Sequence, residues 1–144
     1  MTENTKVSIR ISKNDKILMA WLKKAGEIAE VPLVAYVKAA IRAFLKGKAF
    51  CIGRIKKSEA EAFNAESDYT ATLRFTQPKD GDIITWLDNI KNNPYVMTST
   101  AIKSILTSSI SVIGDGEEEY IPGYRELAGS ATGTENEKNT LDIP

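Results

Sequence analysis

The stretches KVSIRI, residues 6–11, and TATLRF, residues 70–75, decide the fold that this sequence predicts. In each stretch apolar residues alternate with polar ones, which is the two-residue period of a strand with one buried and one exposed face. A helical spacing of apolar residues begins soon after each stretch, so neither has a hairpin partner beside it. A lone strand leaves its backbone N–H and C=O groups unpaired, and we therefore expect the two stretches to pair antiparallel with each other.

An internal repeat supports this pairing. Aligning Arg10 with Arg74 sets an offset of 64 residues and places Ser8 on Thr72. After one extra residue the offset becomes 65, and it then matches Asp15 with Asp80, Trp21 with Trp86, Val31 with Val96 and Lys38 with Lys103. A repeat of about 40 residues is too short to enclose its own core, so we expect the two copies to share one.

Each copy is predicted to carry two amphipathic helices after its strand. In the first copy their apolar positions are Ile17, Leu18, Trp21, Leu22, Ala25 and Ile28, then Leu33, Tyr36, Val37, Ala40, Ile41, Phe44 and Leu45. In the second copy they are Ile83, Ile84, Leu87 and Ile90, then Ile102, Ile105, Leu106, Ile110 and Ile113. Ser12 with Asp15 signals a helix start, and Pro32 and Gly47 bracket the next helix. Both tryptophans are expected to pack in the core.

The predicted fold is mainly α-helical with a short two-stranded antiparallel ribbon, in which strand-helix-helix occurs twice as a pseudo-dimer. The predicted parts are a first unit at 1–47, a connecting segment at 48–69, a second unit at 70–113 and an acidic, mobile tail at 114–144. The tail holds 8 acidic and 2 basic residues. Its apolar residues, expected either to dock on the core or to bind another protein, are Tyr120, Ile121, Tyr124 and Leu127.

Composition argues against several function classes. The chain has no histidine and one cysteine, Cys51, which removes the commonest general base, the commonest metal ligand and any internal disulfide. No glycine-rich phosphate loop is present, so we expect neither an enzyme nor a cofactor. No apolar run reaches the roughly 18 residues of a membrane span, and the first residues lack the order of a signal peptide. We expect a cytoplasmic protein without a membrane partner.

Charge divides the chain into unlike halves although its net charge is zero. Residues 1–57 carry 13 Lys and Arg against 4 Asp and Glu, whereas residues 58–144 carry 6 against 15. This asymmetry predicts an anionic partner such as nucleic acid for the basic half. The alternative is that the lysines simply solvate helix faces.

With these strands, helix starts and loop-separated second helices, the chain resembles the ribbon-helix-helix superfamily of DNA-binding proteins, the Arc and MetJ type. In that family the ribbon enters the major groove, and its outward side chains contact base edges. The resemblance implies double-stranded DNA as the partner, with base contacts from Lys6, Ser8, Arg10, Thr70, Thr72 and Arg74. It also implies phosphate contacts at the starts of the second helices, from Leu33, Val34, Thr98, Ser99 and Thr100.

The connecting segment adds Arg54, Lys56 and Lys57 as candidate phosphate contacts. The fused repeat and acidic tail are similar to TraY-type conjugation accessory proteins and to ParR-type plasmid partition proteins, and a repressor fits the same pattern. A rival from another class is a protein-protein interaction module, antitoxin-like or an adaptor, that keeps the fold without DNA binding. The tail is a candidate surface for such a protein partner. The ribbon can form inside one chain, as a monomeric pseudo-dimer, or between two chains of a homodimer.

Overall fold

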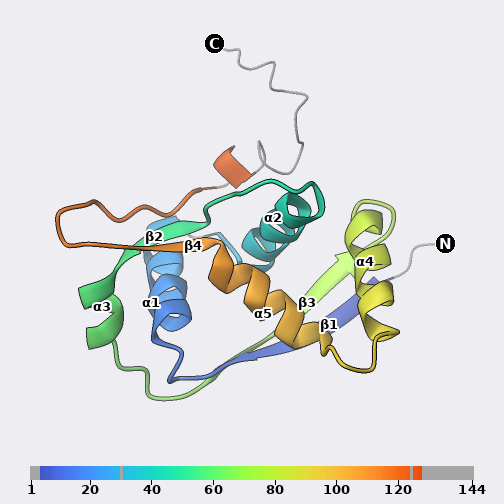
Figure 1. Ribbon diagram of the computed structural model, residues 1–144, viewed down its shortest axis with the longest axis horizontal. Coiled ribbons are helices and arrows are strands. Elements are labelled where there is room, and N and C mark those ends of the chain that lie inside the picture. Colours follow the sequence, from blue (N-terminus) through green and yellow to red (C-terminus); the bar gives the residue numbers. More distant parts are fainter. Residues whose placement is uncertain (1–3, 30, 124, 128–144) are drawn as a thin grey trace, which may run out of the picture.

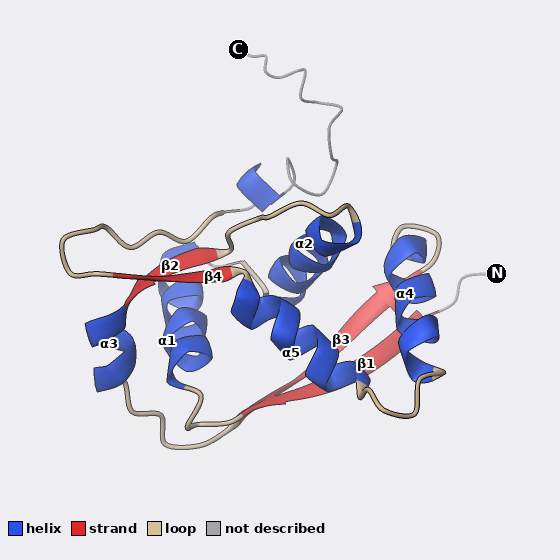
Figure 2. Cartoon of the chain, in the orientation of Figure 1, coloured by secondary structure: helices blue, strands red, loops and turns tan. Residues whose placement is uncertain are grey.

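The computed structural model describes residues 4–29, 31–123 and 125–127 of the 144-residue chain. In chain order the elements are β1 (Asn4–Ile11), α1 (Lys16–Lys24), the π-helical turn η1 (Ala25–Ala29), α2 (Leu33–Leu45), β2 (Gly53–Lys56), α3 (Lys57–Ala62), β3 (Tyr69–Thr76), α4 (Gly81–Lys91), α5 (Thr98–Ser108) and β4 (Ile110–Ile113). They form a mixed α/β fold in which helices lie around two small, separate sheets (Figures 1 and 2). The second of these sheets is not part of the predicted fold.

β1 and β3 form the expected antiparallel ribbon within one chain. The register pairs Lys6 with Arg74, Ser8 with Thr72 and Arg10 with Thr70. Ser8 and Thr72 are also equivalent in the repeat alignment. Residues at equal distances on either side of this pair make reciprocal pairs, Lys6 with Arg74 and Arg10 with Thr70. The ribbon therefore has a pseudo-twofold axis through this central pair, and the predicted pairing of the two stretches is confirmed.

One face of the ribbon lies on the core that the two copies share. Its buried side chains, none more than 8% exposed, are Val7, Ile9, Ile11, Leu73 and Phe75. They belong to a single apolar cluster with residues from α1, α2, α4 and α5. Trp21 of α1 is fully buried in this cluster, and its Nε1 donates to the Ile52 carbonyl at 2.8 Å. The core position predicted for Trp21 is confirmed, while Trp86 packs against the cluster only partly buried.

The helix ends follow the local signals of the sequence. Asp15 caps α1, because its Oδ1 accepts from the Leu18 N–H at 3.3 Å, and Ser12 holds the turn before it by accepting from the Asn14 N–H. Pro32 precedes α2, and Gly47 follows it with a φ of +68°, in the left-handed region that favours glycine. The predicted bracketing of α2 by these two residues is confirmed.

Polar contacts connect the two copies at their strand-to-helix junctions. Asp80, which precedes α4 and is 2% exposed, accepts from Lys38 at 2.9 Å and from Arg42 at 2.8 Å, both on α2. In the other direction Lys103 of α5, the repeat equivalent of Lys38, donates to the Arg10 carbonyl at 2.9 Å. Each second helix thus holds the opposite copy, which fixes the helices relative to the ribbon.

The prediction that Ile110 and Ile113 continue the last helix is wrong. α5 ends at Ser108, and these isoleucines lie in β4, which pairs parallel with β2. The Ser109 hydroxyl donates to the Ile105 carbonyl at 2.7 Å, which satisfies a carbonyl at the helix end. The β-branched sequence after it then favours a strand.

This second sheet covers α1. Gly53 of β2 lies so close to Trp21 that a Cβ there would be 2.5 Å from the indole Cδ1. Arg54 pairs with Tyr120 in an antiparallel bridge, and the Tyr36 hydroxyl donates to the Pro122 carbonyl at 2.7 Å. Of the apolar tail residues, Ile121 and Leu127 are buried on the core, whereas Tyr124 and residues 128–144 lie outside the described residues.

Candidate nucleic-acid interface

The outward face of the ribbon carries all six candidate base-contacting residues. Their side chains are exposed because they alternate with the inward, buried ones, and they are Lys6, Ser8, Arg10, Thr70, Thr72 and Arg74. No acidic residue occurs within β1 or β3. The structure thus brings together, as one surface, six residues taken from two distant parts of the sequence.

Lys6 and Arg74 are direct cross-strand neighbours near one end of the ribbon. Like charges that face each other across two strands destabilise a sheet, so this pair contributes nothing to folding. Among the described residues neither side chain makes an ion pair with a carboxylate. This end of the ribbon is therefore locally positive.

The other end of the ribbon is arranged differently. Arg10 forms an ion pair with Asp68, which lies directly before β3, with 2.6 Å between Nη2 and Oδ2. The second carboxylate oxygen of Asp68 accepts from the Lys13 backbone N–H at 2.8 Å. The pKa of the Asp68 carboxyl lies below its usual value because the Lys13 N–H and the Arg10 guanidinium both donate to it. Among the described residues, a charged carboxylate therefore accompanies Arg10 but not Arg74.

The starts of the two second helices flank the ribbon. α5 packs on β1 (Figure 1). At the start of α2, Val31, Pro32 and Leu33 line a pocket together with Tyr69 of β3. The N-cap residues Pro32 and Met97 make no side-chain cap hydrogen bond, and the positive end of each helix dipole favours an anion at such a start. The candidate residues there differ in character. Leu33 and Val34 pack partly against the core, whereas Thr98, Ser99 and Thr100 carry hydroxyls.

Arg54, Lys56 and Lys57 are not brought to the ribbon. The first two lie in β2 and the third begins α3, and Figure 1 shows both elements on the left of the molecule, whereas β1 and β3 are labelled to the right of centre. The Arg54 guanidinium stacks over the Tyr120 ring at 5.0 Å, and the Lys56 N–H donates to Glu119. These contacts hold the segment after Gly114 in place.

The structure adds one residue that the sequence reasoning missed, Asp68. The repeat alignment contained a sign of this difference, because the offset of 64 places uncharged Asn4 of the first copy on charged Asp68. One copy thus has a carboxylate where the other has an amide.

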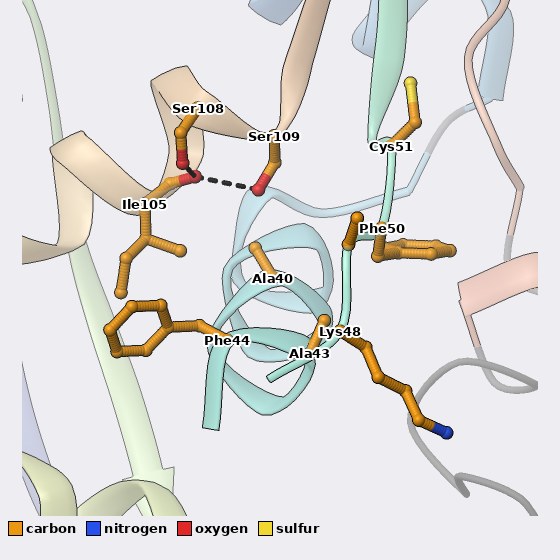
Figure 3. A pocket seen from close by; sticks show the side chains of 10 residues that line it. Ala40, Ala43, Phe44, Lys48, Phe50, Cys51, Ile105, Ser108 and Ser109 are labelled. Carbon is orange, nitrogen blue, oxygen red and sulfur yellow. Dashed lines mark hydrogen bonds between the residues drawn. The ribbon is translucent and has the colours of Figure 1, made fainter. Parts of the chain in front are cut away.

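A pocket of about 360 Å³ opens between the ends of α2 and α5, with Phe44 and Ile105 among its lining (Figure 3). The hydroxyls of Ser108 and Ser109 both donate to the Ile105 carbonyl, at 3.0 and 2.7 Å. The two serine hydroxyls that line this pocket are therefore already engaged within the end of α5.

The described part of the chain contains neither a candidate metal-ion cluster nor a candidate membrane-spanning helix. No cluster of three or more His, Cys, Asp or Glu residues that could hold a metal ion occurs there. Nor does any helix in these ranges have the length and apolar character that crossing a membrane requires. Comparisons with family models, with curated proteins and with solved structures give no significant match to this chain.

Proposed function

We propose that this protein binds double-stranded DNA by inserting the β1–β3 ribbon into the major groove. The observation that carries the proposal is the exposed, acid-free face of a pseudo-twofold ribbon on which Lys6 and Arg74 lie side by side. A two-stranded ribbon matches the width of the major groove of B-DNA. Arginine donates two hydrogen bonds to guanine O6 and N7, and Ser8, Thr70 and Thr72 offer hydroxyls to other base edges.

The helix starts supply the phosphate contacts in this proposal. A ribbon in the groove lies between two phosphate backbones, and phosphate contacts set the register of a protein on the duplex. The hydroxyls and free N–H groups at Thr98–Thr100 suit one backbone, and the free N–H groups of Leu33 and Val34 suit the other. We assign no phosphate contact to Arg54, Lys56 or Lys57, because they lie with the second sheet.

We propose that the fold is a tandem ribbon-helix-helix pseudo-dimer with three additional elements, β2, α3 and β4. A single chain forms the whole ribbon, so one molecule suffices for one groove. Repression, plasmid partition and transfer all begin with such DNA binding, and the DNA site and the partner would decide among them. The rival is an interaction module that binds protein alone.

Substituting Arg74 tests the proposal. Arg74→Ala is expected to weaken binding to a preferred duplex by about 1–3 kcal/mol and to lower the preference for it over a scrambled duplex. Fluorescence anisotropy of the labelled duplexes at several salt concentrations measures both quantities, after the preferred duplex has been selected from a random pool.

The matched control is Lys48→Ala, which also removes one exposed cation. Lys48 lies in the segment between α2 and β2, which Figure 1 shows across the molecule from the ribbon. It is expected to change affinity by less than about 0.5 kcal/mol. Equal losses in the two variants would mean that overall charge, and not the ribbon, attracts the DNA.

A further inference from the structure

We propose that Asp68 positions Arg10 for base reading, so that the two ends of the ribbon read DNA unequally and the preferred duplex site is asymmetric. This inference rests on the proposed function, because it concerns the same ribbon. It adds a positioning residue and a property of the DNA site.

The geometry at Asp68 fixes one edge of the Arg10 guanidinium. Nε and Nη2 of Arg10 both donate to Oδ2, at 2.8 and 2.6 Å. The carboxylate is itself held, since its Oδ1 accepts from the Lys13 N–H. The Arg10 side chain is nevertheless 73% exposed. The guanidinium is therefore tethered on one side and open on the other.

The open side has the donors that a guanine needs. A guanidinium has five N–H groups, and Asp68 engages only the edge formed by Nε and Nη2. The edge formed by Nη1 and Nη2 keeps two N–H donors, which match O6 and N7 of guanine. Because the tether already restricts the rotamers of Arg10, less side-chain entropy is lost when it meets a base.

Arg74 is equivalent to Arg10 in the repeat but has a different environment. It faces Lys6 across the ribbon, whereas Arg10 faces Thr70. The position equivalent to Asp68 is Asn4, which has no charge, and within the described residues Arg74 makes no ion pair. The Arg74 end thus presents two cations that no carboxylate of the described residues holds, so Arg74 can read a base but is not oriented for it in advance. The Arg10 end presents one oriented donor pair, which suits discrimination between bases.

Loss of the Asp68 carboxylate should affect affinity through its charge and base preference through the position of Arg10. These two effects can be measured separately, which makes the inference testable. A carboxylate close to DNA repels phosphate, so removing it should strengthen binding to every duplex. If it also orients Arg10, removing it should weaken the preference for the correct base. If Asp68 had only a structural role, its loss would lower the stability of the fold. It would not selectively change the affinity for duplex DNA or the preference for the correct base.

The experiment is selection of duplexes from a random pool by the wild-type protein, followed by anisotropy with the selected duplex and single-base variants of it. The wild type is expected to enrich an asymmetric motif with a guanine at one end. Asp68→Asn should lower the preference for that guanine by about fivefold, the low end for one arginine-guanine pair, and should tighten binding to a scrambled duplex. Asp68→Glu, which keeps the carboxylate, should retain most of the preference.

Glu61→Gln is the control for charge, because Glu61 lies on α3 with the second sheet and its side chain is 67% exposed. It should leave the base preference unchanged, and thermal unfolding should show each variant folded. A palindromic motif with equal halves, or an unchanged preference in Asp68→Asn, would overturn the inference and leave the proposed function standing. If the wild type enriches no motif at any salt concentration, the proposed function fails and the inference fails with it.

Discussion

At the scale of single residues, Asp80 is the clearest case of a charge used for folding. It is 2% exposed and contacts Lys38, Arg42 and the Thr76 N–H. Burial acts to raise the pKa of this carboxyl, but these three donors outweigh burial and hold the pKa below its usual value. The carboxylate is therefore charged in the folded protein and joins α2 of one copy to the helix start of the other.

Replacing Asp80 should destabilise the protein. Asp80→Asn removes the charge that Lys38 and Arg42 share, and we expect the free energy of unfolding to fall by about 2–4 kcal/mol, since breaking a buried pair leaves its partners uncompensated. Urea unfolding followed by tryptophan fluorescence measures this loss. Asp82→Asn is the control, because Asp82 contacts the same Arg42 but is 49% exposed, and it should cost less than about 1 kcal/mol. Equal costs would contradict the role assigned to Asp80.

The same variant has a pH signature. The folded pKa of Asp80 lies below its value of about 3.9 in an unfolded chain, so its contribution is present above that pH and is lost as the pH falls through the folded pKa. The decline in stability below about pH 4 should therefore be shallower in Asp80→Asn than in the wild type.

At the scale of elements, the ribbon was predictable and the second sheet was not. The alternation in residues 6–11 and 70–75 is local, and the repeat offset by itself aligns the two strands. β2 and β4 are short, and their parallel pairing joins Gly53 to Ile110, which no local pattern connects. Ile110 and Ile113 are three residues apart, a spacing that also fits a helix.

The candidate site was predictable to a similar extent. All six ribbon residues follow from the alternation and lie on one exposed face. Asp68 could not be found in this way, because it lies outside both strands and reaches Arg10 only once the register is set. That Arg54 and Lys56 lie with the second sheet could not be predicted for a related reason, since their position depends on the unpredicted pairing of β2 with β4.

The close approach of β2 to α1 gives a second stability prediction. Gly53→Ala would place a Cβ 2.5 Å from the rigid indole of Trp21, and we expect overpacking to lower the free energy of unfolding by about 1–3 kcal/mol. Gly116→Ala, where nothing lies within 4 Å of the added Cβ, should stay within about 0.5 kcal/mol of the wild type. Thermal or urea unfolding compares the two, and an unaffected Gly53→Ala protein would show that β2 does not lie tightly on Trp21.

At the scale of the whole molecule, the acidic segment after Gly114 lies away from the ribbon (Figure 1). The segment that carries Asp115 and Glu117–Glu119 runs beside the second sheet, away from the ribbon (Figure 1). Such a separation lets the ribbon side approach a polyanion while the acidic side faces away from it. The division of charge along the sequence is not a complete division in space, however, because Lys24 pairs with Glu119 at 3.0 Å and Asp68 pairs with Arg10.

The most direct test of DNA binding by the ribbon is to map where a duplex contacts the folded chain. In a titration of ¹⁵N-labelled protein with the selected duplex, the account predicts that amide shifts concentrate in β1, β3 and the first turns of α2 and α5. A scrambled duplex, as the control, should cause smaller shifts in the same elements that disappear as salt is raised. Shifts centred on β2, α3 and β4, with the ribbon unchanged, would contradict the account.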